Sequence, residues 1–184
     1  MPKVLLPLTT GFEEIELVSV ADVLRRADLR VILASLASSL EVKGAHNITI
    51  KADCLLKTLE VDDFDAIVMH GGMDGVRNML ASSALLQIVE DFGRKKKIIG
   101  AICAAPLVLD DLKMLTQDFC CYPGCERMMK NTQNKRLDLG FKTSQNIITG
   151  TGPAFAMSFA IEIVRNLIGD SFAQELQKEL LLSK

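Results

Sequence analysis

Cys103 lies where a strand-like segment meets a helix-like one, a position at which a thiol could act as a nucleophile. Residues 98–102 read Ile-Ile-Gly-Ala-Ile, which is typical of a buried strand, and Pro106 suits the first turn of a helix. The small Ala104 permits a tight strand-to-helix turn, as in nucleophile elbows. Free N–H groups and a helix dipole at such a turn would lower the thiol pKa from its usual value of about 8.5. The alternative interpretation is that Cys103 is a small, inert hydrophobic residue.

The segment 70–75, His-Gly-Gly-Met-Asp-Gly, follows a second apolar strand and lets the backbone approach a ligand closely. We expect the N–H groups of Gly72 and Ala104 to form an oxyanion hole together. A dinucleotide-binding fingerprint is excluded, because Met73 stands where that motif requires glycine. His70 could serve as an acid or a base, although a histidine that is merely hydrogen-bonded at a strand end is the favoured interpretation.

Three carboxylates, Glu13, Glu14 and Glu16, fall in the first turns of the first predicted helix. Negative charge at that end of a helix is favourable beside the helix dipole, which is the simplest explanation for them. Glu16 cannot share the exposed face with both of its neighbours, however, and could be turned toward the sheet. A carboxylic acid kept protonated by burial could then donate a hydrogen bond to a Cys103 thiolate.

Strand-like and helix-like segments alternate along the chain, the pattern of a mostly parallel sheet with helices on both faces. In such sheets ligands bind beyond the carboxyl ends of the strands, where the three junctions described above would meet. No linker or repeat interrupts the pattern, so we expect a single domain over residues 1–184. The predicted strands cover residues 3–8, 30–36, 66–69, 97–102, 118–122 and 146–149, with a hairpin at 41–52. The predicted helices cover residues 13–27, 82–96, 153–168 and 171–182, with a short helix between Cys103 and Leu112.

The composition is that of a globular protein. Of 184 residues, 49% are hydrophobic and 24% are charged, which excludes a disordered chain. The net charge of −2 offers no excess of positive charge, so we do not expect nucleic acid to be a main partner. No apolar run is long enough to span a bilayer, and we expect a cytoplasmic protein.

The five cysteines are expected to be free thiols, because their number is odd and the chain is large for a disulfide scaffold. An ordinary zinc site is improbable with only two histidines, His46 and His70. Cys120, Cys121 and Cys125 could supply soft ligands, but Cys120 and Cys121 are adjacent and would point to opposite faces of a strand. We therefore expect no metal and no cofactor.

Five short motifs carry a resemblance to a known family. They read Gly-Phe-Glu-Glu-Ile-Glu at 11–16, Asp-Val-Leu-Arg-Arg-Ala at 22–27, Met-His-Gly-Gly-Met-Asp-Gly at 69–75, Ala-Ile-Cys-Ala-Ala-Pro at 101–106 and Thr-Gly-Thr-Gly-Pro at 149–153. In order and spacing they resemble the ThiJ/PfpI superfamily over essentially the whole chain, most closely the branch of the parkinsonism-associated protein deglycase. The resemblance implies a flavodoxin-like three-layer α/β sandwich, of the class I glutamine amidotransferase type, with a nucleophile elbow. It also implies a homodimer.

The resemblance further implies the site and its chemistry. Cys103 becomes the catalytic nucleophile, hydrogen-bonded to a protonated Glu16. The implied substrate-binding and oxyanion residues are Gly71, Gly72, Ala104, Glu13, Thr151 and Pro153. The implied activity is that of a cofactor-independent glyoxalase, which converts methylglyoxal to lactate without glutathione, or of a deglycase acting on early glycation adducts. The expected partner is therefore a small α-oxoaldehyde or a glycated substrate.

Two departures from the family pattern affect the chemistry. Ala104 stands where the protease-like branch has a histidine, so a Cys-His protease dyad is absent there. Tyr122 precedes Pro123 where the parkinsonism-associated branch has a histidine. Tyrosine donates hydrogen bonds but is a poor base at neutral pH. We expect Tyr122, or a water molecule, to assist Glu16 in moving protons.

Two other functions are weighed against catalysis. The first is a redox-sensing, chaperone-like stress protein in which Cys103 is oxidised to a sulfinic acid that Glu16 stabilises. The second is an interaction module whose predicted helix 13–27 packs against its copy in a dimer, with Asp22, Arg26 and His46 as polar contacts at the interface. Ordinary surface charge is the alternative interpretation of those three residues.

Overall fold

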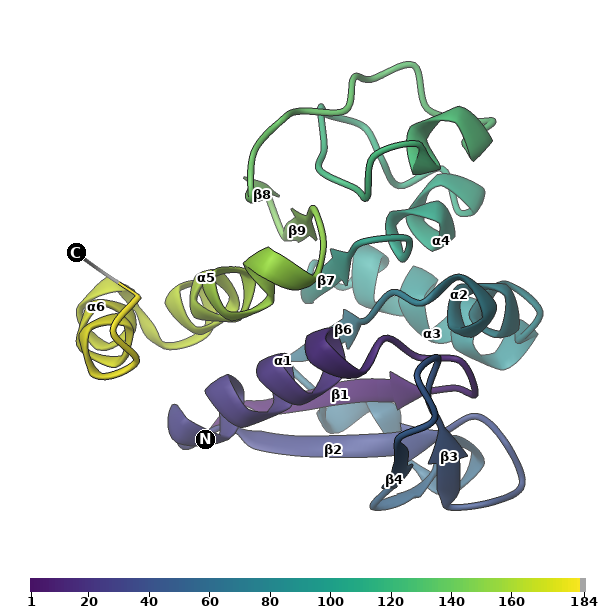
Figure 1. The fold of residues 1–184 in the computed structure, drawn as a ribbon, viewed down its shortest axis with the longest axis horizontal. Coiled ribbons are helices and arrows are strands. Elements are labelled where there is room, and N and C mark those ends of the chain that lie inside the picture. Colours follow the sequence, from purple (N-terminus) through teal and green to yellow (C-terminus); the bar gives the residue numbers. More distant parts are fainter. Residues whose placement is uncertain (183–184) are drawn as a thin grey trace.

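Seven strands form one twisted sheet in a computed structural model that describes residues 1–182 (Figure 1). Their order is β5-β2-β1-β6-β7-β9-β8, and every neighbouring pair is parallel except β8 with β9. A separate antiparallel hairpin joins β3 to β4. The strands are β1 (Lys3–Leu8), β2 (Arg30–Ser35), β3 (Glu41–Lys43), β4 (Thr49–Lys51), β5 (Cys54–Leu55), β6 (Ala66–Met69), β7 (Ile98–Ile102), β8 (Phe141–Ser144) and β9 (Ile147–Gly150).

Helices cover both faces of the sheet. On one face α1 packs against α5, and α6 packs against α5; on the other, α2 contacts α3 and α4, which lie on β6 and β7 (Figure 1). The helices are α1 (Glu14–Arg26), α2 (Met73–Leu80), α3 (Ser83–Arg94), α4 (Pro106–Asp111), α5 (Ala156–Ile168) and α6 (Asp170–Glu179). The predicted flavodoxin-like three-layer sandwich is thus confirmed. None of the helices in residues 1–182 has the length and apolar character needed to cross a bilayer.

The centre of the sheet is apolar because helices bury it from both sides. All four residues of β6 are buried, as are residues 99–102 of β7. Gly100 gives α5 room to approach β7, since a Cβ there would lie 3.1 Å from Phe159 Cζ. The register pairs Met69 with Ala101. The chain leaving β6 at Gly71 therefore emerges beside the chain leaving β7 at Cys103.

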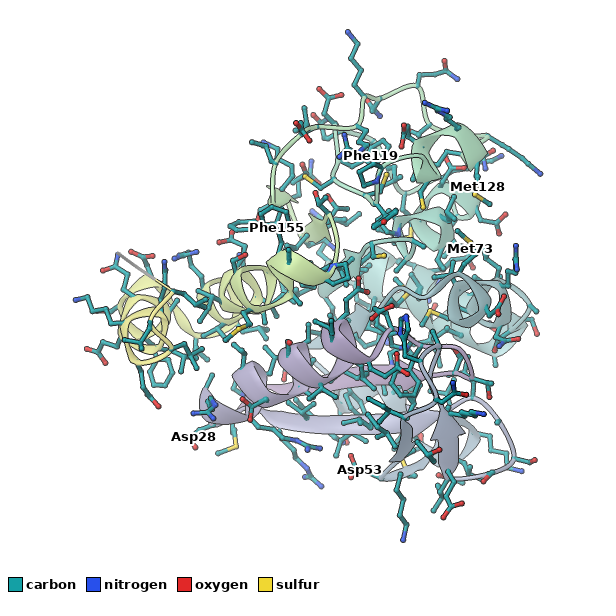
Figure 2. All side chains as sticks on the ribbon, in the orientation of Figure 1. Asp28, Asp53, Met73, Phe119, Met128 and Phe155 are labelled. Carbon is teal, nitrogen blue, oxygen red and sulfur yellow. The ribbon has the colours of Figure 1, made fainter. Side chains whose placement is uncertain are left out.

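The predicted strand at 118–122 is wrong. Only an isolated bridge, between Phe119 and Arg136, forms there. The backbone N–H of Cys120 donates to the side-chain hydroxyl of Thr149 on β9 (2.9 Å) and not to a backbone carbonyl of that strand. The apolar pattern that suggested a strand reflects burial alone. Phe119 is buried although it lies in the long connection between α4 and β8 (Figure 2).

One α-helix and two strands were not predicted from the sequence. These are α2, which begins directly after the Gly71-Gly72 turn, and the short edge strands β5 and β8. The last two predicted helices also start differently. Residues 153–155 form a separate turn of 3-10 helix before α5, and α6 begins at Asp170.

Candidate active site

Cys103 occupies a strained turn between β7 and α4. Its φ of 64° lies in the left-handed region, which residues with a side chain rarely adopt and which clusters at functional sites. Two hydrogen bonds hold the turn: the Cys103 N–H donates to the Gly150 carbonyl (2.9 Å), and the Cys103 carbonyl accepts from the Tyr122 N–H (2.8 Å). The residue is only 9% exposed. The backbone thus has the form of a nucleophile elbow with restricted access.

Glu16 presents its carboxyl to the same point from α1. Its side chain is fully buried, and Oε2 accepts a hydrogen bond from the Gly71 N–H at 2.6 Å. Oε1 has no partner of normal hydrogen-bond geometry, which is true of no other buried side-chain nitrogen or oxygen in residues 1–182. Buried polar atoms are nearly always satisfied, so an exception of this kind needs a functional explanation.

Gly71 is what allows the thiol and the carboxyl to meet. A Cβ at this position would lie 2.7 Å from Cys103 Sγ and 2.7 Å from Glu16 Oε2. Any side chain would therefore fill the space in which the two groups face each other. Glycine is required at this position because the thiol and the carboxyl approach the backbone closely, and not because of its φ angle.

The charge balance at the site differs from the sequence expectation. Burial raises the pKa of the Glu16 carboxyl from 4.5 to about 7, against the opposing effects of the hydrogen bond from the Gly71 N–H and of the nearby Cys103 thiol. Burial also raises the pKa of the Cys103 thiol, and the negative charge of Glu16 raises it further. The expected lowering of the Cys103 pKa by the helix end is therefore wrong. The N–H groups of Gly72 and Ala104 do lower it, but burial outweighs them.

Those two N–H groups converge on Cys103 from different elements. Gly72 precedes α2 with a φ of 85°, and Ala104 follows Cys103 directly. A Cβ at Gly72 would lie 2.2 Å from the Gly11 carbonyl oxygen, so this position requires glycine on both steric and conformational grounds. The arrangement has the form of an oxyanion hole beside the sulfur.

Four other residues of the expected site make the following contacts. The Glu13 N–H donates to the Gly71 carbonyl (3.1 Å), and the charge of Glu13 raises the pKa of Glu16. Tyr122 is half exposed, and its ring covers Gly152, where a Cβ would lie 3.2 Å from Tyr122 Cδ2. Thr151 turns its hydroxyl to the Leu139 carbonyl, and Pro153 opens the 3-10 turn before α5.

Of the three residues expected at a dimer interface, Asp22 and Arg26 pair with each other, and His46 lies near the other end of α1. Arg26 pairs with Asp22 (2.7 Å) and approaches Glu179 (3.7 Å) at the end of α1. His46 lies near the start of α1, where its Nδ1 is 2.9 Å from Glu14 Oε2.

The His46–Glu14 contact was not anticipated from the sequence, since the two residues belong to different segments. The hydrogen bond that the His46 ring donates to the Glu14 carboxylate raises the pKa of His46. Together with Glu13 these residues bring their ligand atoms within 4.8 Å of one another, and no other such set of metal-ligating side chains occurs in residues 1–182. Cys120, Cys121 and Cys125 are free, buried thiols.

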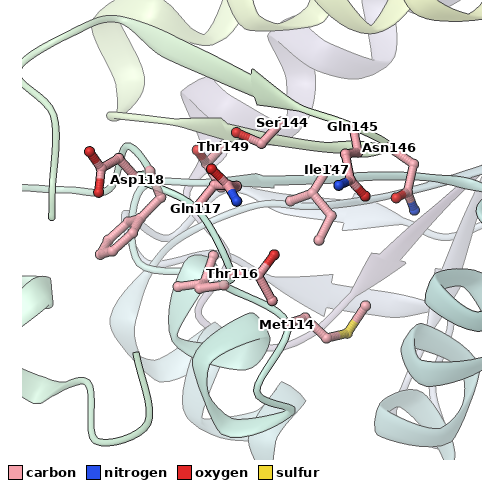
Figure 3. Close-up of a pocket in the computed structure, with 11 residues that line it drawn as sticks. Met114, Thr116, Gln117, Asp118, Ser144, Gln145, Asn146, Ile147 and Thr149 are labelled. Atoms are coloured by element: carbon pink, nitrogen blue, oxygen red, sulfur yellow. The ribbon is translucent and has the colours of Figure 1, made fainter. Parts of the chain in front are cut away.

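A small cavity of about 30 Å³ lies elsewhere, between residues 114–119 and the β8–β9 turn (Figure 3). This volume accommodates roughly one water molecule, and Cys103 does not line it. The cavity is too small for an organic substrate. Larger open clefts of about 360–600 Å³ also lie away from Cys103, so the Cys103–Glu16 pair is the candidate active site on its chemistry and not on the size of a cavity.

Comparisons with known proteins agree with this geometry. Residues 2–166 match the DJ-1/PfpI family. The chain is 33% identical over 177 residues to the protein dj-1beta of Drosophila melanogaster, covering 96% of this chain and 95% of that one. The crystal structure of that protein matches with a TM-score of 0.93 at 32% identity, covering 100% of this chain and 99% of the other.

Two further relatives bear on function and on length. The glutathione-independent glyoxalase DJR-1.2 of Caenorhabditis elegans is 33% identical over 172 residues, covering 94% of this chain and 91% of that protein. Protein DJ-1 homolog B of Arabidopsis thaliana is 32% identical over 184 residues, but the chain spans only 41% of its length. Together with the Cys103 elbow and its buried carboxyl, these matches show that the chain belongs to the DJ-1/PfpI family.

Proposed function

We propose that this protein is a cofactor-independent glyoxalase that converts small α-oxoaldehydes to 2-hydroxy acids. The observation that carries the proposal is the Cys103 thiol facing the fully buried Glu16 carboxyl, whose pKa is raised to about 7. A base or acid is most effective when its pKa lies near the working pH. The name of the Caenorhabditis elegans relative supports the same reaction class.

The first step is addition of sulfur to the aldehyde. The Cys103 thiol gives its proton to the Glu16 carboxylate as the sulfur bonds to the aldehyde carbon of methylglyoxal. The carbonyl π pair moves to oxygen, which is held by the Gly72 and Ala104 N–H groups. This oxygen then takes the proton that Glu16 received, which completes a hemithioacetal and restores the Glu16 carboxylate. One oxyanion-hole donor contributes on the order of 3 kcal/mol to such a step. Glu16 thus acts here as general base, and no preformed thiolate is required.

The second step moves hydrogen between adjacent carbons. Glu16 removes the proton from the carbon that carries sulfur, giving an enediol, and a proton is then delivered to the neighbouring carbon. This converts the hemithioacetal to the thioester of lactate, so one carbon is oxidised while the other is reduced and no external oxidant is needed. Tyr122 or a water molecule assists the transfer. Water then hydrolyses the thioester, which releases lactate and restores the thiol.

The restricted access to Cys103 favours small substrates. With 9% of Cys103 exposed, a three-carbon aldehyde reaches the sulfur more readily than an adduct on a folded protein. We therefore place the glyoxalase reaction ahead of direct deglycation of proteins.

The test is lactate formation from methylglyoxal without glutathione. We expect Cys103→Ser to lower turnover by at least about 10³-fold, because the nucleophile of a covalent mechanism is lost. Cys125→Ser, which replaces another buried thiol, is the matched control and should retain turnover. Wild-type turnover in Cys103→Ser would overturn the proposal.

We further propose that the protein forms a homodimer through α1. Ile15 and Val18 are large apolar residues on this helix, and they are 57% and 49% exposed. An exposed apolar stripe on one helix is a feature of interaction surfaces. We expect Val18→Glu to shift the protein from dimer to monomer in sedimentation velocity. Arg26→Glu should have a smaller effect, since Arg26 already pairs within its own chain. A monomeric wild type would contradict the proposal.

A further inference from the structure

His70 is a buried titratable residue that the mechanism above does not use. It follows β6 and is 1% exposed. Its Nδ1 lies 2.8 Å from the Gly71 carbonyl oxygen, and its Nε2 lies 3.0 Å from the Pro7 carbonyl oxygen. The ring of Phe12 packs edge-on against it, with the ring centroids 5.8 Å apart. The imidazole is therefore fixed on three sides.

The Gly71 carbonyl belongs to the peptide group that carries the Gly72 N–H. This carbonyl accepts a hydrogen bond from the Glu13 N–H (3.1 Å), and His70 Nδ1 lies 2.8 Å from its oxygen. The N–H of the same peptide faces Cys103 and lowers the pKa of its thiol. Donors at a carbonyl polarise the whole amide and strengthen its N–H as a donor. His70 is thus one peptide group away from the sulfur.

A neutral imidazole carries one N–H, so it donates a hydrogen bond to only one of the two carbonyls beside the ring. Burial keeps it neutral at physiological pH, since it lowers the pKa of His70 to about 4. The nitrogen nearer its carbonyl is Nδ1. Protonation at Nδ1 places the single N–H on the Gly71 carbonyl.

We propose that His70 is a positioning residue of the Cys103 site: its Nδ1–H holds and polarises the Gly71–Gly72 peptide, which makes the Gly72 N–H a stronger donor to the sulfur and to the oxyanion. This deepens the proposed function, because it concerns the same site. The proposed role differs from a purely structural one, in which His70 would only connect the end of β6 to β1. A link to β1 would require only the contact with the Pro7 carbonyl.

Two substitutions separate the roles of the two ring nitrogens. Asparagine carries its amide nitrogen at the position of Nδ1, whereas glutamine carries its own near the position of Nε2. His70→Asn therefore keeps a donor for the Gly71 carbonyl, and His70→Gln keeps one for the Pro7 carbonyl. The readout is the rate at which iodoacetamide alkylates Cys103 in the folded protein, followed by peptide mapping. This rate reports the nucleophilicity of the sulfur and does not depend on any substrate.

We expect His70→Gln to slow Cys103 alkylation by about tenfold, because weakening a donor costs less than the 10²-fold or more that follows its removal. His70→Asn should stay within about threefold of wild type. Equal rates in the two variants, or slower alkylation in His70→Asn, would overturn the proposal. Because alkylation needs no aldehyde, the expected pattern without lactate formation would overturn only the proposed glyoxalase reaction.

A measurement on the wild type covers the case in which both variants unfold. Nitrogen-15 NMR of the ring distinguishes a protonated Nδ1 from a protonated Nε2. We expect the proton of His70 on Nδ1. A proton on Nε2 would refute the proposal, since the Gly71 carbonyl would then receive nothing from the ring.

Discussion

Glu16 and Asp110 are both buried carboxylates, yet their surroundings differ. Asp110, at the end of α4, accepts hydrogen bonds from the N–H groups of Lys130 (2.7 Å), Asn131 (3.2 Å) and Thr132 (2.7 Å). Both of its oxygens are thereby satisfied. Glu16 accepts one such bond, from Gly71, and its second oxygen has no partner.

The difference separates a structural role from a chemical one. The N–H donors around Asp110 belong to a single loop, so the carboxylate fixes that loop against α4 and has no capacity left for a ligand. Glu16 keeps one oxygen without a partner, its carboxyl faces the Cys103 thiol across Gly71, and burial raises its pKa to about 7. A buried carboxylate that is fully hydrogen-bonded stabilises the fold, whereas one left incomplete is able to exchange protons.

The largest expected effect tests the Glu16 side of this comparison through the pH dependence of stability. Folding raises the pKa of Glu16 from 4.5 to about 7, so the native protein binds this proton more tightly than the unfolded chain does. The contribution of the protonated Glu16 carboxyl to the free energy of unfolding is fully present below pH 4.5 and is lost as the pH rises through about 7. We expect the free energy of unfolding of wild type, relative to Glu16→Gln, to fall by about 3 kcal/mol across this range.

Urea unfolding at a series of pH values gives this difference directly. Glu14→Gln is a useful control, because Glu14 behaves in the opposite way. Burial alone would raise the pKa of Glu14, but hydrogen bonds from His46 and Ile48 lower it below its usual value. Its contribution should therefore be lost as the pH falls. A flat difference between wild type and Glu16→Gln would show that the Glu16 carboxyl is not desolvated as described.

A somewhat smaller effect tests the Asp110 side. Asp110→Ala leaves three backbone N–H groups of the 130–132 loop without their acceptor. Hydrogen bonds to charged groups contribute about 1.5–3 kcal/mol each, and water replaces part of them in an exposed loop, so we expect a net loss of about 2 kcal/mol in the free energy of unfolding.

Asp110→Ala should leave the rate of Cys103 alkylation unchanged. Asp111→Ala, at the exposed neighbouring position, is the matched control and should change stability by no more than about 0.5 kcal/mol. Slower alkylation in Asp110→Ala at full stability would erase the distinction between the two carboxylates.

The smallest expected effect concerns whether Glu16 moves protons alone. Tyr122 is joined to Cys103 through its backbone N–H, and its ring covers Gly152. We expect Tyr122→Phe to reduce lactate formation by about tenfold or less, because the hydroxyl assists a transfer that a water molecule also serves. Stability should stay within about 0.5 kcal/mol, since the side chain is half exposed. Unchanged turnover would assign the proton transfer to Glu16 and water.

The alternating apolar pattern predicted the sheet, because burial on both faces leaves a continuous apolar run in β6 and β7. It failed at 118–122, where Phe119 and Cys120 are buried although the segment forms only an isolated bridge, and it gave no sign of the nearby 130–132 loop that Asp110 holds. Periodicity reports burial and does not report what a segment is buried against. The partners of Asp110 lie about twenty residues further along the chain, and no local pattern marks them.

The sequence by itself determined the α/β class, the strand-to-helix turn at Cys103 and the family, since these depend on local residue types and their order. Only the tertiary structure decided the charge on the site. The pKa values of Cys103 and Glu16 depend on their burial and on the short distance between them across Gly71, although the two residues are far apart in the chain. The helix end that should have lowered the thiol pKa is outweighed by the loss of water, because desolvation opposes charge on either group.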